Sequence, residues 1–160
     1  MTIVAFVSAL VTAFAYFQYF KANEIEKKSW RSFSRVSFYI HTFSTVMIAI
    51  SLFEIIYNHR YEYFYAYSHS SKALPVHYMI SSFWEGQEGA FILWAFWNVI
   101  LGVILIYTNK KWEAPVMIVF SLVQAFLVSM IMGVVIGDLK IGSSPFILLR
   151  DATQAPIFQV

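Results

Sequence analysis

Few side chains in this sequence could do chemistry, and they are unevenly placed. Of the four histidines, His41 lies in an apolar stretch, whereas His59, His69 and His77 fall in a polar connection further along. The separations of 10 and 8 residues among these three match no usual metal-ligand spacing, so no metal site is predicted. A haem held by two imidazoles needs both histidines at the same depth. His41 is therefore a candidate haem ligand, but a hydrogen-bonded packing residue is the better interpretation.

Two carboxylates, Glu85 and Glu88, precede a long apolar run. A carboxylate at a membrane edge can serve as a proton or ligand site. Carboxylates also favour the amino terminus of a helix, because its N–H groups are unpaired there. The helix terminus accounts for Glu85. Glu88 keeps both interpretations, since it shares a helical face with Asn98.

Tryptophans gather around these carboxylates, at Trp84, Trp94 and Trp97. Aromatic belts at membrane interfaces account for most other tryptophans and tyrosines, but less well for these three. Signatures of nucleotide binding, zinc proteases and serine hydrolases are absent, so no catalytic residue is predicted. The candidate cofactor-binding residues are Trp84, Glu88, Trp94 and His41.

The composition indicates the class of protein in which these candidate residues lie. The 160 residues are 59% apolar and 12% charged, against about 45–50% and about 25% in soluble domains. The mean hydropathy is +0.64. A net charge of +2 is too small to indicate nucleic-acid binding, and without cysteine no disulfide or thiolate metal site can form. The chain is predicted to be an integral membrane protein.

Four stretches are apolar for long enough to cross a bilayer, which takes about 20 residues. The predicted spans are 2–20, 36–57, 89–109 and 114–137. The first is a retained helix and not a signal peptide, because its positive charges follow it. The predicted fold is an all-α, polytopic membrane bundle with an outer loop at 58–88 and an outer tail at 138–160.

Lysine and arginine predict the orientation of these spans. The connections between spans one and two and between spans three and four hold seven of them, and the rest of the chain holds four. Because basic connections stay in the cytoplasm, both termini are predicted to lie outside.

The outer loop and the tail are predicted to have structure of their own. Tyrosines alternate over Tyr61–Tyr67, which predicts an extended segment, and 68–71 suits a turn. From Pro75, apolar side chains at helical spacing predict a short amphipathic helix along the membrane surface. Its apolar residues are Val76, Met79, Ile80, Phe83 and Trp84. Ser144–Pro145 suits the cap and first turn of another short helix, through Arg150.

Residues that recur every three or four positions predict how the spans pack. Small residues let another helix approach closely, and polar ones are expected to face protein, since lipid cannot satisfy them. On the first span the small residues are Ala5, Ala9 and Ala13. On the fourth they are Ser121, Ala125, Ser129, Gly133 and Gly137. On the third, one face carries Glu88, Phe91, Ala95, Asn98 and Gly102.

The segment Leu74–Trp94, LPVHYMISSFWEGQEGAFILW, resembles the CcmF-type haem lyase component of cytochrome c biogenesis. The matching residues are Leu74, Pro75, Tyr78, Trp84, Gln87, Glu88, Gly89 and Trp94. Ser144-Pro145-Phe146 with Leu149 is similar to an Asn-Pro-Phe stretch that follows the fourth span in that family. The order of spans and basic loops also agrees, so the resemblance covers nearly the whole chain.

This resemblance implies a role in attaching haem covalently to apocytochrome c outside a bacterial inner membrane, with other cytochrome c maturation proteins as partners. The family's haem-binding histidines come later in the full-length protein. This chain is therefore expected to be a non-catalytic amino-terminal scaffold that holds no haem alone. Gln87 stands where many relatives have histidine, which argues against an indispensable ligand there.

Two alternatives remain. One is a subunit of a transporter or quinone-reactive complex, with Glu88, Asn98 and His41 along a proton or substrate path. The other is a membrane scaffold without small-molecule chemistry.

Overall fold

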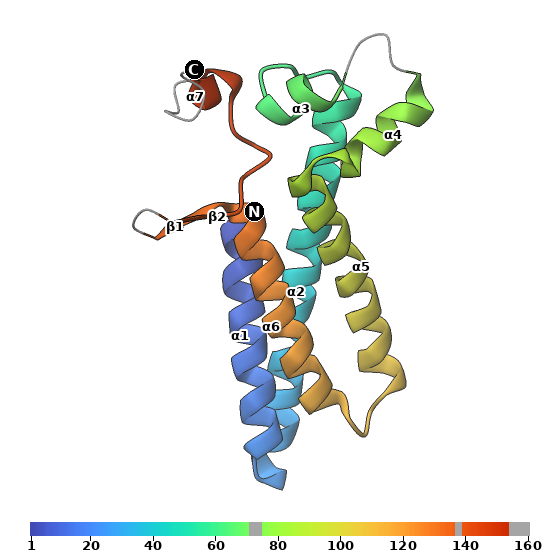
Figure 1. Ribbon diagram of the computed structural model, residues 1–160. Helices are drawn as coiled ribbons and strands as arrows, with labels where there is room; N and C mark the ends of the chain where they lie inside the picture. The colour runs from blue at the N-terminus through green and yellow to red at the C-terminus, as the bar shows by residue number, and fades with distance from the viewer. Residues whose placement is uncertain (71–74, 137–138, 154–160) are drawn as a thin grey trace.

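The computed structural model describes residues 1–70, 75–136 and 139–153. Over these residues the chain forms four long helices, three short helices and one small hairpin (Figure 1). The long helices are α1 (Thr2–Lys21), α2 (Glu24–Tyr57), α5 (Gln87–Thr108) and α6 (Glu113–Met132). The short ones are α3 (Phe64–His69), α4 (Val76–Glu85) and α7 (Leu149–Thr153). Strands β1 (Val134–Ile136) and β2 (Leu139–Ile141) pair antiparallel, with Val134 opposite Ile141.

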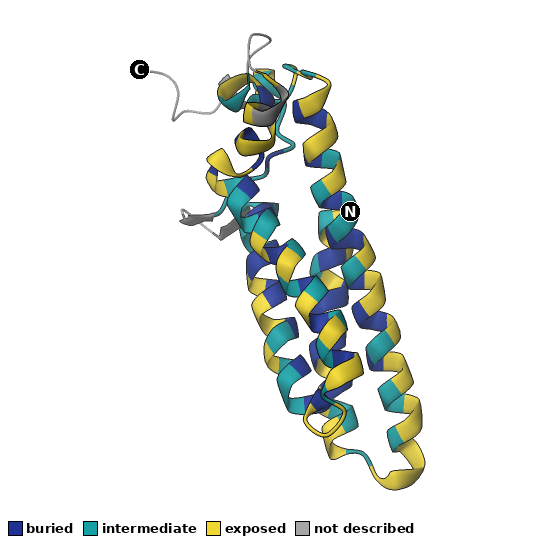
Figure 2. Ribbon diagram, turned by 90° about the vertical axis from the view of Figure 1, so that its right-hand side faces the viewer, coloured by how far each residue is buried: buried dark blue, intermediate teal, exposed yellow. Residues whose placement is uncertain are grey.

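The helical part of the predicted fold is confirmed: α1, α2, α5 and α6 are long and apolar enough to cross a membrane. These helices are consistent with an integral membrane protein. Their outer faces carry large apolar side chains, whereas the buried residues line the inside of the bundle (Figure 2). Such an arrangement suits lipid contact, because lipid tails do not penalise exposed apolar surface.

Two helix boundaries differ from the predicted spans. Helix α2 begins at Glu24 and not at 36, because its charged first turns continue the helix beyond the apolar stretch. Helix α6 ends at Met132 and not at 137. Gly133 takes a left-handed conformation (φ 69°) that ends the helix, as glycine commonly does. Gly133 is therefore a cap and no part of a packing stripe, and Gly137 lies outside the described residues.

The extended segment predicted from the alternating tyrosines is wrong over Tyr65 and Tyr67, which lie in helix α3, whereas Tyr63 is extended and forms a β-bridge with Leu148. The predicted turn is also wrong at Ser68 and His69, which belong to the same helix, and Ser71 lies outside the described residues. The alternation does not decide the conformation of this segment. As a helix, the segment buries the side chain of Tyr65, and this packing favours the helix over an extended strand. Helix α4 is present where the sequence predicts one, directly after Pro75, and its position on a membrane surface stays a prediction.

The tail helix predicted from Ser144–Pro145 is wrong in its start, because α7 begins only at Leu149. The preceding residues pair with the α2–α3 connection instead. The N–H of Leu149 donates to the carbonyl of Glu62 (2.8 Å), and the N–H of Phe64 donates to that of Ile147 (3.0 Å). A backbone segment that pairs in an extended conformation cannot also be helical. Helix α7 therefore begins only after this pairing ends.

Helix α1 packs more closely against α2 and α6 than any other pair of helices does. The alanines at 5, 9 and 13 of α1 are buried, and so are Ser121 and Ala125 of α6, as the small-residue pattern predicts. Helix α5 completes the bundle against α2 and α6. The ring of Phe38 on α2 packs directly on Gly102 of α5, where even a Cβ atom would collide with it.

Candidate functional site at the corner between α4 and α5

The segment that carries the family resemblance forms a sharp corner between two helices. Helix α4 ends at Glu85 and α5 begins at Gln87, so Gly86 alone separates them. Gly86 is extended (φ −85°, ψ 156°), which breaks the helix without left-handed backbone. Trp84 is therefore the last but one residue of α4, and Glu88 is in the first turn of α5.

The side chain of Tyr65 on α3 packs against this corner and is hydrogen-bonded to its backbone. Its side chain is 2% exposed, and its hydroxyl donates to the carbonyl oxygen of Phe83 (2.9 Å), with that of Ser82 at 3.2 Å. The same hydroxyl accepts the N–H of Gly86 (3.2 Å). The ring stacks on His69 with centroids 4.5 Å apart. Burial raises the pKa of Tyr65 to about 12, so the hydroxyl keeps its proton at neutral pH.

Two glycines of the corner are required by space. A Cβ atom on Gly86 would lie 2.6 Å from Cε2 of Tyr65. A Cβ atom on Gly89 would collide with the carbonyl oxygen of Phe83 and with the hydroxyl of Tyr65. Real Cβ contacts are never so short, and the collision at Gly89 is with backbone, which cannot turn aside. The corner therefore keeps its shape only with glycine at these positions.

An apolar groove of about 310 Å³ lies beside the corner, between α2, α4 and α5. Trp84 is 46% exposed and forms part of its wall. Its lining is entirely apolar: Ala49, Ile50, Phe53, Ile80, Phe83, Trp84, Leu93 and Phe96. Such a groove can take an apolar chain, ring or helix face, but it offers no ligand to a metal.

Trp94 and Glu88 do not line this groove. Trp94 is 59% exposed on the outer face of α5 and lies edge-to-face on Phe91, with centroids 5.8 Å apart. Glu88 is half-buried. The structure thus brings Trp84 to a groove, leaves Trp94 on the outside of the bundle, and does not join these residues into one site.

His41 is fully buried on α2 and bonded to neighbouring helix backbone. Its Nδ1 lies 2.8 Å from the carbonyl oxygen of Ala5, which places the ring proton there and ties α2 to α1. Its Nε2 lies 3.5 Å from Oγ1 of Thr45. None of the cavities described here is lined by His41. A haem ligand needs a free nitrogen facing a roomy pocket, so these surroundings fit a packing residue and do not fit a haem site.

The other histidines have separate surroundings. His69 stacks on Tyr65, His59 stacks on Tyr61, and the side chain of His77 lies outside the described residues. Among the residues that the structure describes, no three His, Cys, Asp or Glu side chains group as metal ligands.

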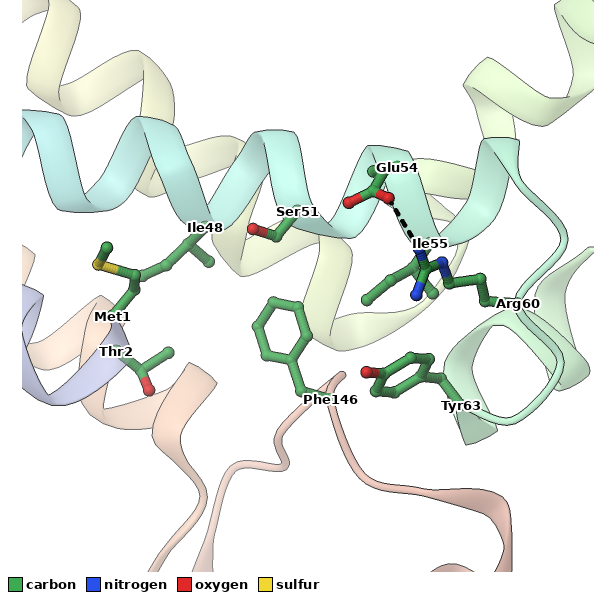
Figure 3. A pocket seen from close by; sticks show the side chains of 9 residues that line it. All are labelled: Met1, Thr2, Ile48, Ser51, Glu54, Ile55, Arg60, Tyr63 and Phe146. Atoms are coloured by element: carbon green, nitrogen blue, oxygen red, sulfur yellow. Dashed lines mark hydrogen bonds and ion pairs between the residues drawn. The ribbon is translucent and has the colours of Figure 1, made fainter.

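The second stretch that carries the resemblance lies at another cavity, of about 350 Å³ (Figure 3). Phe146 of the tail points into it from one side, and α2 forms the opposite wall. There Glu54 and Arg60 form an ion pair at 3.2 Å. The walls of this cavity carry both polar and apolar side chains, in contrast to the wholly apolar groove beside Trp84.

Sequence reasoning missed the most extensive charge arrangement among the residues that the structure describes. The carboxylate of Glu113, at the start of α6, is fully buried between two arginines of α2. Arg35 donates through Nε to Oε1 (2.7 Å) and through Nη2 to Oε2 (2.8 Å), and Arg31 donates through Nη2 to Oε2 (2.8 Å). The hydroxyl of Tyr16 on α1 donates to Oε1 (3.4 Å), and Arg35 also reaches the carbonyl of Ile106 on α5 (3.4 Å).

This Glu113 cluster joins all four long helices at one end of the bundle. The only signals for it in the sequence are two arginines four residues apart and one carboxylate at the start of a span. Since 78 and 82 residues separate the partners, no local pattern could pair them.

Comparisons with protein-family models, with curated proteins and with solved structures give no match.

Proposed function

We propose that this chain is the amino-terminal membrane scaffold of a haem-handling protein of cytochrome c maturation, one that helps attach haem covalently to apocytochrome c. One observation carries the proposal: the segment that resembles the CcmF-type component forms the α4–α5 corner. Its Gly89 stands where any Cβ atom would collide with the carbonyl oxygen of Phe83. The glycine of the resembling motif thus has a defined structural role at this corner.

The described residues act in this proposal by positioning. Tyr65 fixes the corner, the corner sets the direction of α4, and Trp84 of α4 forms one wall of the apolar groove. The resemblance implies that the haem is bound by other parts of the parent protein. The scaffold supplies a rigid apolar surface for those parts.

We propose a bacterial inner membrane as the location, with both termini on the periplasmic side. The charge distribution supports this orientation, because seven lysines and arginines lie near the α1–α2 and α5–α6 turns. Single cysteines at Lys27 and Lys111 are then expected to resist an impermeant maleimide in intact cells, while cysteines at Ser70 and Ser143 react. Labelling at 27 or 111 would reverse the orientation.

A quinone-reactive subunit is the second candidate, favoured by the apolar groove alone. A groove with wholly apolar lining also suits the tail of a lipid-soluble quinone. The proposed proton or substrate path has less support, since His41 already bonds the Ala5 carbonyl and neither Glu88 nor Asn98 lines the groove.

Deleting the encoding gene separates these two functions. The haem-handling proposal expects c-type cytochromes to lose covalent haem, detected by haem peroxidase staining after denaturing electrophoresis, while b-type cytochromes stay unchanged. Restoring the full-length gene is expected to restore the stain. Normal c-type cytochromes in the deletion strain would overturn the proposal, and a lost quinone-dependent activity there would favour the second candidate.

A further inference from the structure

A groove between α2 and α5 lies on the outside of the Glu113 cluster. It has a volume of about 360 Å³. Four residues of its wall, Lys28, Arg31, Ser32 and Arg35, recur on one face of α2 at helical spacing. The remaining lining residues are Val36, Tyr39 and Tyr107. Tyr39 and Tyr107 join α2 to α5 through a hydrogen bond between their hydroxyls (3.0 Å).

The positive charge in this groove exceeds what Glu113 neutralises. Two guanidinium groups share one carboxylate, and each bonds it through Nε and Nη2, which leaves each Nη1 without a partner among the described residues. Lys28 is exposed and also has no partner among them. The Glu113 carboxylate holds both arginines in fixed directions, so their free N–H groups are already oriented for another anion.

The surroundings of the groove indicate what kind of anion it suits. Directly beyond it, both helices carry exposed apolar side chains on their outer faces: Val36, Ile40 and Phe43 on α2, and Leu101 and Ile104 on α5. From Val36 to Phe53 no charged residue occurs on α2. The groove thus lies where the charged part of α2 meets its apolar part, the depth at which lipid phosphates lie in a bilayer.

We propose that this groove binds the phosphate headgroup of an anionic phospholipid. Guanidinium N–H groups form strong, charge-assisted bonds to phosphate oxygens, and here the Nη1 of each arginine can supply them. Lys28 and the Ser32 hydroxyl add further donors. The acyl chains would lie along the apolar side chains of α2 and α5. A free phosphate ion would gain nothing from those side chains, so the lipid is the favoured occupant. This inference needs insertion of the four helices into a membrane and is independent of haem.

The test measures lipid binding to the full-length protein in detergent by native mass spectrometry. Phosphatidylglycerol is expected to remain bound at concentrations where phosphatidylcholine does not. Lys28→Gln is expected to raise the Kd for phosphatidylglycerol about fivefold, the loss of one cation near a lipid surface. The matched control is Lys110→Gln, which removes another exposed lysine at the same end but from a different groove. The Kd of the Lys110→Gln protein for phosphatidylglycerol is expected to equal that of the wild type.

Three results would overturn the proposal. Equal binding of the two lipids would remove the role of negative charge. An equal loss in Lys28→Gln and Lys110→Gln would mean that the charge of the whole end, and not this groove, attracts lipid. Inorganic phosphate that raises the melting temperature as much as phosphatidylglycerol, and only when Lys28 is present, would assign the groove to a free anion.

Discussion

The two ends of the helix bundle are held together in different ways. At the end where α1 meets α2 and α5 meets α6, which we call the basic end, one buried carboxylate binds two arginines and a tyrosine. At the opposite end, which we call the cap end, α3, α4 and α7 lie over the bundle (Figure 1). There the neutral hydroxyl of Tyr65 and close contacts at Gly86 and Gly89 fix the shape.

This difference separates stability from shape. A buried charge without a partner is costly, so the basic end is expected to depend on a few residues strongly. The cap end has no such charge in its corner, and small changes there are expected to alter the direction of α4 more than the integrity of the bundle. The net charge differs accordingly: the basic end has seven Lys and Arg against three Glu, and the rest of the chain has four against six acids.

The largest effect is expected from Glu113→Ala at the basic end. The substitution leaves two arginines facing each other at the bundle edge, and breaking such a pair costs about 3 kcal/mol where the arginines keep some solvent contact. Unfolding by titration with SDS in mixed micelles measures the loss. The matched control is Glu24→Ala, which removes an exposed carboxylate paired with Lys27 and is expected to cost less than about 0.5 kcal/mol. Equal losses would refute the role of the cluster.

A smaller but clear loss is expected from Gly89→Val at the cap end. The added atoms must displace the carbonyl of Phe83 or the hydroxyl of Tyr65, and overpacking of this kind costs about 1–3 kcal/mol. Gln87→Val is the control, because it places the same residue at an exposed position two residues earlier in α5. A stable Gly89→Val protein with unchanged α4 protease sensitivity would show that the corner is not tightly packed.

The next effect in size is that of Tyr65→Phe, which keeps the ring and removes the hydroxyl. The N–H of Gly86 and the carbonyl of Phe83 then lose their partner, at a cost of about 1–2 kcal/mol. Tyr67→Phe changes an exposed tyrosine of the same helix and is expected to have no effect. The measurement is hydrogen exchange at the amides of residues 82–90, and unchanged exchange in Tyr65→Phe would contradict the expectation.

The smallest effect is the pH dependence of the same residue. Because burial raises the pKa of Tyr65 to about 12, the folded protein keeps this proton more tightly than the unfolded chain, whose tyrosines titrate near 10. The contribution of the protonated Tyr65 hydroxyl to the free energy of unfolding is complete below pH 10 and is lost as the pH rises towards 12. The melting-temperature difference between the wild type and Tyr65→Phe is therefore expected to shrink above pH 10. A constant difference would contradict the burial of the hydroxyl.

The sequence predicts the long helices and α4 well, and α3 and α7 poorly. Runs without charge locate the apolar parts of all four long helices, whose length matches what a bilayer crossing requires. They misplace the start of α2, because Glu24–Arg35 is helical although it is charged, and the end of α6, because Gly133 stops the helix before the apolar run ends. The alternating tyrosines mislead, since burial of Tyr65 decides the structure of α3.

The candidate site could be predicted only as a segment. The motif around Gly89 is visible in the sequence, but its partner Tyr65 comes from another helix, and nothing local indicates that its hydroxyl reaches the Phe83 carbonyl. Glu113 is hidden for the same reason, as its arginines lie on a different helix. Contacts between distant residues depend on how helices pack, which single-sequence patterns do not specify.

The central claim is that the corner serves haem handling while the basic end holds the bundle together. It is tested by the covalent haem on c-type cytochromes, divided by the amount of this protein in the membrane. The strain is deleted for the gene and carries variants of the full-length protein. Haem peroxidase staining of c-type cytochromes is divided by the amount of protein on an immunoblot. The account predicts a lower ratio for Tyr65→Phe, an unchanged ratio for Tyr67→Phe, and for Glu113→Ala less protein at an unchanged ratio. An unchanged ratio both in Tyr65→Phe and in the separate variant Gly89→Ala would contradict the account.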